Sequence, residues 1–363
     1  MIKLRKITST MKSVGISISF KGAVAFLFIL SANGLYAQSF PVDSIFSIIR
    51  TNHVEAPNAD WNHLAKLTEE TLSNATSKQD SIMAVVDIFA ELNDVHSSIT
   101  VDGQTYGFYN PVSDSVYALI APMLSLSQTQ QGVVFDTLLA DNIAYLRIPS
   151  IMAWGDDAIN SYALQVQQTL CTTLDADPDA LIIDLRLNTG GNMYPMLAGL
   201  WPILGDETVL YTMFPNGEPQ FIWFLKKGNL YARDGVQTSF QNQITNVEPA
   251  CKKANQSIKV YVLVGPLTAS SGQATAVALM GRPNTLFIGE PTADGYITAN
   301  NYYPIGEHIQ LNLSSAYIAD RNKVAYPRIF LPQVYVLGGD NFLHLSQDLK
   351  VQMSKMMFNR KNK

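Results

Sequence analysis

Two adjacent serines stand where a nucleophile could act. In "GPLTASSGQ", Ser270 and Ser271 follow an apolar run and open a stretch of small residues. A side chain at such a strand-to-helix turn lies at the carboxyl end of a sheet, beside the partial positive charge of a helix N-terminus. The position suits an attacking hydroxyl, because the next backbone N–H can bind an oxyanion. Serine is also a favoured helix N-cap, and on its own such a motif is more often a cap.

A second strand-to-turn site lies in "DLRLNTGG", which ends in Gly190 and Gly191. Glycine adopts backbone conformations that other residues avoid, and it lets amide groups approach a ligand closely. Such amides can form an oxyanion hole, although a Gly-Gly pair more often only turns the chain. Asp184 and Arg186 alternate at the strand end and so lie on one side of it. For Arg186 this setting predicts a salt bridge to a nearby acid.

A serine nucleophile needs a base, and His96 is the histidine whose setting fits best. It lies in "NDVHSS", a polar loop, whereas His63 follows an exposed helical pattern and His344 is in the C-terminal tail. A lone loop histidine is nevertheless more often a solvated polar residue. The sequence contains no HExxH or CxxC spacing, so we expect neither a metal nor an organic cofactor.

The elements that must position these residues indicate an α/β fold. Residues 258–264, 270–280 and 285–289 alternate as strand, helix and strand, and the apolar runs are continuous rather than alternating. Continuous apolar strands are typical of a buried, largely parallel sheet. Residues 207–244 read instead as strands and hairpins, with turns at "PNGEP" and "KKGNL".

The chain divides into four predicted segments. Residues 1–37 are expected to be a signal peptide, 38–97 a helical N-terminal domain, 98–340 the α/β domain, and 341–363 a helical tail. The helical domain is predicted from apolar residues at three- and four-residue spacing.

The signal peptide is predicted from basic residues followed by "GAVAFLFILSANGLYA" and cleavage after Ala37. The "YAQ" junction resembles signal peptides of Bacteroidetes, so a periplasmic or secreted protein without a stable membrane span is expected. An uncleaved membrane anchor is the alternative.

Composition narrows the possible partners. The chain has 363 residues, of which 47% are hydrophobic, and a net charge of −5, which argues against nucleic-acid binding. Its two cysteines, Cys171 and Cys251, could pair in an oxidising compartment. Because Cys171 lies on the apolar side of a helical pattern, the prediction is two unpaired thiols.

Taken together and in order, these stretches resemble peptidase family S41, the tail-specific and tricorn-like serine proteases. The elements are "DVHSS", "DLRLNTGG", "TASSGQ" and "GEPTADG", and the resemblance spans roughly residues 40–336. It implies a ClpP/crotonase-like core with a small helical N-terminal domain. It also implies a polypeptide substrate, often entered from its C-terminus, and assigns Ser270 as nucleophile with Ser271, Gly190 and Gly191 at the oxyanion hole. Binding of the substrate's terminal carboxylate is the alternative to a salt bridge for Arg186.

The resemblance points to the branch that uses a histidine base. Tail-specific proteases place a lysine where this chain has Gly295, and no lysine occurs between Ser270 and Lys323. His96 matches the histidine of the tricorn-like branch. Fewer than fifty residues separate His96 from the strand at Ile143, which leaves no room for a PDZ domain.

Two positions depart from the family pattern. Gln273 stands where the family often has Glu, and the segment "YPRIFLPQV" lacks the usual orienting acid. Asp320 is the candidate replacement, with Asp294 and Glu290 as alternatives. A triad without its acid loses several orders of magnitude in rate. The function that the resemblance implies is a secreted serine endopeptidase, in which His96 deprotonates Ser270 and an acyl-enzyme forms. The alternative is a degenerate S41-fold protein that binds peptides or apolar ligands, as the related modules of retinoid-binding proteins of the eye do.

Overall fold

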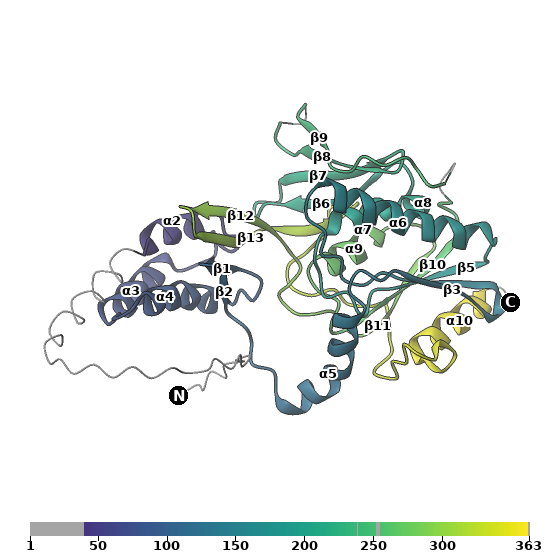
Figure 1. The fold of residues 1–363 in the computed structure, drawn as a ribbon, viewed down its shortest axis with the longest axis horizontal. Coiled ribbons are helices and arrows are strands. Elements are labelled where there is room, and N and C mark those ends of the chain that lie inside the picture. Colours follow the sequence, from purple (N-terminus) through teal and green to yellow (C-terminus); the bar gives the residue numbers. More distant parts are fainter. Residues whose placement is uncertain (1–39, 238, 252–254, 362–363) are drawn as a thin grey trace, which may run out of the picture.

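The computed structural model describes residues 40–237, 239–251 and 255–361 (Figure 1). The predicted signal peptide and its cleavage site lie outside these residues. Within the described part, no helix is long and apolar enough to cross a membrane.

The N-terminal lobe begins with the three predicted helices. They are α2 (Val42–Asn52), α3 (Trp61–Ser73) and α4 (Lys78–Glu91). The Asp60 carboxylate accepts two N–H groups in the first turn of α3, and Ser77 forms a capping box with the first turn of α4. Both side chains satisfy N–H groups that a helix leaves unpaired at its start.

The apolar faces of these helices pack on two strands from later in the chain. Strand β1 (Ser98–Val101) contributes Ile99, and β13 (Ile309–Asp320) contributes Leu311 and Leu313 to the same core. This core therefore extends past residue 97. The division of the chain at 97/98 stays a prediction.

An antiparallel sheet runs from this lobe into the rest of the molecule. Its order is β2 (Gln104–Gly107), β1, β13, β6 (Thr208–Met213), β7 (Pro219–Lys226), β8 (Asn229–Asp234) and β9 (Gln241–Gln243). Two further strands, β12 (Thr298–Ile305) and β14 (Ala325–Tyr326), also pair with β13. The predicted strands and hairpins of residues 207–244 thus form the far end of this sheet.

The second sheet is the predicted parallel one. Its order is β15 (Val334–Tyr335), β11 (Thr285–Gly289), β10 (Lys259–Val264), β5 (Ala180–Asp184), β4 (Ile143–Arg147) and β3 (Phe135–Leu139). Only the pairing of β3 with β4 is antiparallel. The α/β class is confirmed.

Helices cover both faces of the parallel sheet (Figure 1). Alternate side chains such as Ile183 and Val262 pack with one group of helices, while Ile182 and Leu263 pack under the C-terminal helix. The first group is α6 (Asp156–Asp175), α7 (Met193–Gly199), α8 (Trp201–Leu204) and α9 (Ser271–Leu279), and the C-terminal helix is α10 (Leu349–Lys361). Burial on both faces explains why the strands are apolar throughout.

One helix has no counterpart in the sequence prediction. Helix α5 (Asp114–Thr129) has Ser113 as its N-cap and contains Pro122. Of its side chains only Ser127 is buried, and Leu119 is 76% exposed. Its apolar residues run almost continuously over residues 116–126 without the spacing of an amphipathic helix, which is why the pattern did not reveal it.

The two cysteines are joined, so the prediction of unpaired thiols is wrong. Cys171 in α6 and Cys251 form a disulfide, with Cα atoms 5.7 Å apart. Cys171 does lie on the buried side of α6, but the segment that leads into β10 returns to the same place. The partners are 80 residues apart, so their spacing carried no signal.

We expect the disulfide to contribute about 2–4 kcal/mol to the free energy of unfolding, because it closes a long loop in the unfolded chain. Alkylation of the unreduced, denatured protein should label no thiol. The paired Cys171→Ala/Cys251→Ala variant should fold with a lower denaturation midpoint. Two alkylated cysteines in unreduced protein would contradict the pairing.

Candidate active site

Ser270 lies where the loop after β10 enters α9, next to the loop after β5. Because β5 and β10 are parallel neighbours, their carboxyl ends meet at one edge of the sheet. The Ala269 N–H donates to the Asn188 carbonyl at 3.0 Å, and the Thr268 hydroxyl donates to the Leu185 carbonyl at 3.0 Å. These bonds join the "TASSGQ" loop to the "DLRLNTGG" loop.

The backbone of Ser270 is strained at the point where it begins helix α9. Its φ is 51° and its ψ is −119°, a region that non-glycine residues rarely adopt. Such conformations cost about 1–3 kcal/mol and cluster at functional sites. Ser270 is the N-cap of α9 and shares a capping box with Gln273. The turn also presents the Ser270 hydroxyl to a histidine from the other lobe.

Gln273 holds this turn through both ends of its amide. Its Oε1 accepts the Ser270 N–H at 3.0 Å, while its Nε2 donates to Thr292 Oγ1 at 2.7 Å and to the Ala293 carbonyl at 2.8 Å. The side chain is fully buried. A carboxylate could accept from Ser270 but has no proton for Ala293, so Gln suits this site where the family often has Glu.

His96 reaches Ser270 from the loop between α4 and β1. Its Nε2 lies 3.0 Å from Ser270 Oγ, and its Nδ1 lies 2.7 Å from Thr298 Oγ1 on β12. Backbone groups fix the same residue, since its N–H donates to Asp94 at 2.8 Å and its carbonyl accepts from Asn300 Nδ2 at 3.0 Å. Both ring nitrogens and both backbone groups are therefore engaged.

The surroundings of His96 keep its imidazole neutral. Burial lowers its pKa to about 4, and the negative charge of Asp94 opposes the shift only in part. At Asp94 burial acts to raise the pKa, but the hydrogen bond and charge of His53, with further donors, lower it overall. Near neutral pH the site thus holds a neutral imidazole beside a buried carboxylate.

The predicted oxyanion residues divide into two roles. The Gly190 N–H donates to Asn188 Oδ1 at 3.1 Å, and a Cβ on Gly190 would lie 2.9 Å from the Ser270 Cβ. Gly190, with φ 119°, therefore permits the close approach of the two loops. The N–H groups of Gly191 and Ser271 have no hydrogen-bond partner in the described part of the chain. The Ser271 hydroxyl donates to the Gly191 carbonyl at 2.7 Å and holds these two donors together.

None of the three acids considered from the sequence contacts His96. Asp320 accepts the N–H groups of Asn322 and Val324 in the turn after β13. Asp294 pairs with Arg328, and Glu290 pairs with Lys350. The expectation of Asp320 as the orienting acid is thus not supported by its position.

The residue that sequence reasoning missed is Thr298, which occupies the Nδ1 side of the ring. It follows His96 by 202 residues, and a threonine in a strand is unremarkable by type. No sequence signal distinguishes it from other threonines.

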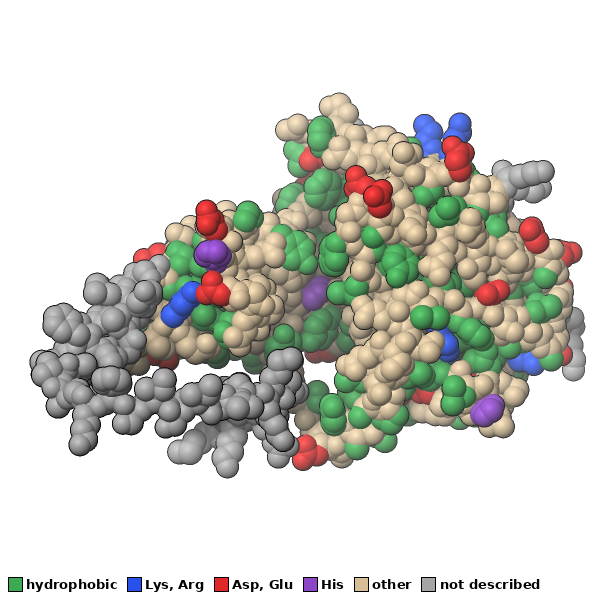
Figure 2. All heavy atoms as spheres, viewed as in Figure 1, with side chains coloured by type: hydrophobic (Ala, Val, Ile, Leu, Met, Phe, Trp, Pro, Cys, Tyr) green, Lys and Arg blue, Asp and Glu red, His purple; other side chains and the backbone are tan. Residues whose placement is uncertain are grey.

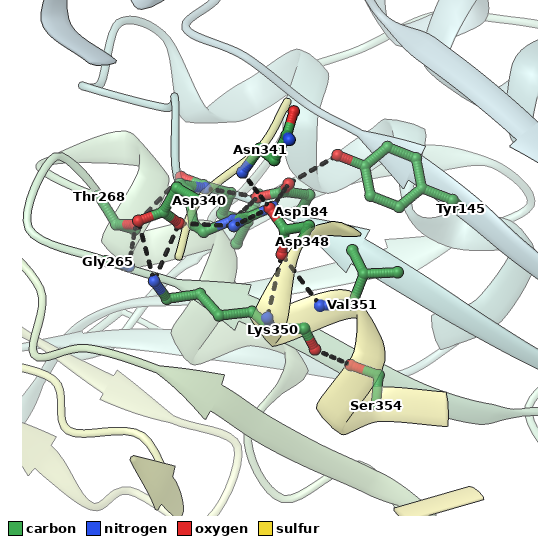
Figure 3. Close-up of polar contacts among 12 residues, drawn as sticks. Tyr145, Asp184, Gly265, Thr268, Asp340, Asn341, Asp348, Lys350, Val351 and Ser354 are labelled. Carbon is green, nitrogen blue, oxygen red and sulfur yellow. Dashed lines mark hydrogen bonds and ion pairs between the residues drawn. The ribbon is translucent and has the colours of Figure 1, made fainter. Parts of the chain in front are cut away.

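Arg186 lies in a buried cluster of charged side chains at the end of β5. It contacts Asp184 at 2.6 Å, Asp340 at 2.6 Å and Asp348 at 2.8 Å. Lys350 of α10 also contacts Asp340, and Figure 3 shows the acids and the lysine converging. The predicted salt bridge of Arg186 is confirmed, and its guanidinium is 1% exposed.

A cavity of about 380 Å³ opens beside Ser270 and His96. Figure 2 shows hydrophobic side chains along the hollow between the two lobes. Among the described residues, the lining includes no Lys, Arg, Asp or Glu. Its aromatic members are Trp154, Tyr194, Phe221, Trp223 and Tyr302. Over the same described residues, no group of three or more His, Cys, Asp or Glu could hold a metal ion.

The family model "Peptidase family S41" matches residues 142–327, and the chain belongs to this family. A nisin-resistance protein of Lactococcus lactis subsp. lactis is 29% identical over 267 residues, which are 74% of this chain and 73% of the relative.

Solved structures share the fold. A lipoprotein from Streptococcus agalactiae matches with a TM-score of 0.60 and 20% identity, over 93% of this chain and 99% of that one. Mature CPAF matches with a TM-score of 0.51 and 11% identity, over 91% of this chain and 96% of that one. The S41 protease fold expected from the sequence is confirmed.

Replacing Gln273 by Glu should destabilise the protein, because a buried carboxylate would face the Ala293 carbonyl without a proton to donate. Burial raises the folded-state pKa of such a carboxyl group. The loss of folding stability should therefore be small at acidic pH and grow as pH rises. We expect a cost of about 1–3 kcal/mol near pH 8. Urea unfolding at pH 5 and pH 8 measures it, with wild type as the control. Equal stability of the two proteins at both pH values would contradict this role of Gln273.

Proposed function

We propose that this S41 family member is a serine peptidase with Ser270 as nucleophile and His96 as general base. The observation that carries the proposal is the 3.0 Å contact between His96 Nε2 and Ser270 Oγ, which joins residues 174 positions apart. Supporting it are the strained turn at Ser270 and the neutral imidazole, both typical of activated serines.

The reaction proceeds in two halves. Ser270 Oγ attacks the substrate carbonyl carbon while its proton passes to His96 Nε2, and the oxyanion binds the N–H groups of Gly191 and Ser271. His96 then returns the proton to the leaving amine, and the C–N bond breaks to leave an acyl-enzyme. In the second half water attacks the ester, His96 takes its proton, and Ser270 regains a proton as the acid product leaves.

The substrate is a polypeptide, as the family implies, bound in the uncharged aromatic cavity. Arg186 is buried in its own ion pairs and does not serve as a receptor for a substrate C-terminus. The name of the Lactococcus relative makes nisin a first peptide to test. The predicted signal peptide and the disulfide favour a periplasmic or secreted location.

A fluorophosphonate probe should form one adduct on Ser270 of the mature protein, residues 38–363. Ser270→Ala should give no adduct, and His96→Ala should slow labelling by about 100-fold or more. Intact mass and peptide mapping measure the site and extent. A folded wild type that takes up no probe would contradict the peptidase and favour a ligand-binding protein.

Labelling should persist at unusually low pH. Because the pKa of His96 is lowered from 6.5 to about 4, the base form remains populated as pH falls through 6 and 5. The labelling rate should therefore stay near its maximum down to about pH 5 and fall near pH 4. Circular dichroism at each pH controls for unfolding. A midpoint near 6.5 in folded protein would show that His96 is not desolvated.

A further inference from the structure

We propose that Asp94 is the acid behind His96, acting through two hydroxyl groups rather than by direct contact. The inference rests on the proposed peptidase function and assigns Thr298, Ser314 and Asp94 as positioning residues. Together they would take the place of the acid that the sequence lacks at the usual family position.

The four groups form a continuous hydrogen-bonded path. His96 Nδ1 lies 2.7 Å from Thr298 Oγ1, which lies 3.1 Å from Ser314 Oγ. Ser314 Oγ lies 3.1 Å from Asp94 Oδ1. The path joins the loop before β1 to strands β12 and β13, and the pairing of these two strands holds Thr298 and Ser314 in place.

Proton counting gives the path one direction. When Ser270 donates to His96 Nε2, the single proton of the neutral ring is on Nδ1 and donates to Thr298 Oγ1. Thr298 then donates to Ser314, and Ser314 donates to Asp94. Each group donates once in this arrangement, and the path ends on an oxygen that has no proton.

Hydrogen-bond donors around Asp94 stabilise its carboxylate form although the residue is buried. Its Oδ1 also accepts the N–H groups of His96 at 2.8 Å and Ser97 at 3.0 Å. Its Oδ2 lies 2.8 Å from Nε2 of the buried His53. The Glu55 N–H donates to His53 Nδ1 at 3.0 Å, so in a neutral ring the proton must be on Nε2 and donate to Asp94.

The path matters most when His96 is charged. As Ser270 attacks, His96 gains a proton at Nε2 and becomes an imidazolium, whose Nδ1–H is a stronger donor. The aligned hydroxyls and the carboxylate stabilise that charge, and no proton has to leave Nδ1. Other titratable groups around the site are Tyr296, whose ring contacts that of His96, and Arg328 and Glu55 near Asp94.

Thr298 has one proton and a second acceptor within reach. Asn300 Oδ1 lies 3.0 Å from Thr298 Oγ1, close to the 3.1 Å of Ser314 Oγ. If the path ended at Asn300, Ser314 and Asp94 would have no part in it. Replacing the Ser314 side chain distinguishes these cases, because its backbone bonds to Val54 and Ser97 do not need the hydroxyl.

The test measures fluorophosphonate labelling of Ser270 as kinact and KI from pH 4 to 9. The variants are Thr298→Val and Ser314→Ala, with Thr298→Ser as the matched control that keeps the hydroxyl. Asp94 itself is left intact, because it also caps the N–H groups of the His96 loop. We expect Thr298→Val to lose about 10- to 100-fold in kinact with KI unchanged. The kinact of Ser314→Ala should also fall, and the kinact of Thr298→Ser should stay near that of wild type.

The pH profile separates positioning from simple structural support. Without an acceptor for Nδ1–H, the imidazolium loses more hydrogen-bond stabilisation than the neutral ring does, and the pKa of His96 falls. The acidic limb of the labelling profile of Thr298→Val should therefore move to lower pH. If wild type is labelled and Ser314→Ala is labelled equally fast, the hydrogen-bonded path is wrong while the proposed function stands. Unreactive wild type would overturn the proposed function and this inference together. If Thr298→Val does not fold, as judged by circular dichroism, Ser314→Ala decides.

Discussion

Strand β13 belongs to both lobes, and the meeting of Ser270 with His96 depends on it. Its first half pairs with β1 and buries Leu311 and Leu313 among the N-terminal helices, while its second half pairs with β6 and buries Ile318 in the larger core. A hydrogen bond between two side chains contributes only about 1 kcal/mol and cannot hold two lobes together. The backbone pairing of a 12-residue strand can, so the sheet sets the distance between the two side chains.

The same arrangement explains how a strained, polar site is tolerated. The unfavourable conformation of Ser270 is fixed by Gln273, whose amide is fully used, and the buried charge of Asp94 is surrounded by donors. Buried polar groups destabilise a protein mainly when they are left unpaired. The contact between His96 and Ser270 joins residues 174 positions apart and in different lobes, so the site forms only when both lobes are folded.

Local pattern predicted much of this fold, and long-range pairing explains most of what it missed. The three N-terminal helices have apolar residues at helical spacing, and α3 and α4 also have side-chain caps. The elements around β10 are marked by continuous apolar runs, and the strand-to-turn motifs located the loops of Ser270 and Gly190. The disulfide, Thr298 and the shared strand β13 depend on contacts between residues 80 or more positions apart, for which one sequence holds no signal. Helix α5 was missed for a different reason, since its apolar residues form a nearly continuous run without a helical period.

The charge cluster around Arg186 has a consequence for the timing of synthesis. Asp348 follows Arg186 by 162 residues, and translation at about 5–20 residues per second separates them by roughly 8–30 s. Until Asp340 and Asp348 are made, the Arg186 guanidinium lacks two of its three acidic partners. A nascent chain that already holds Ser270 and His96 therefore lacks the completed charge cluster. Among the described residues, this cluster is thus one of the last features of the fold that synthesis can complete.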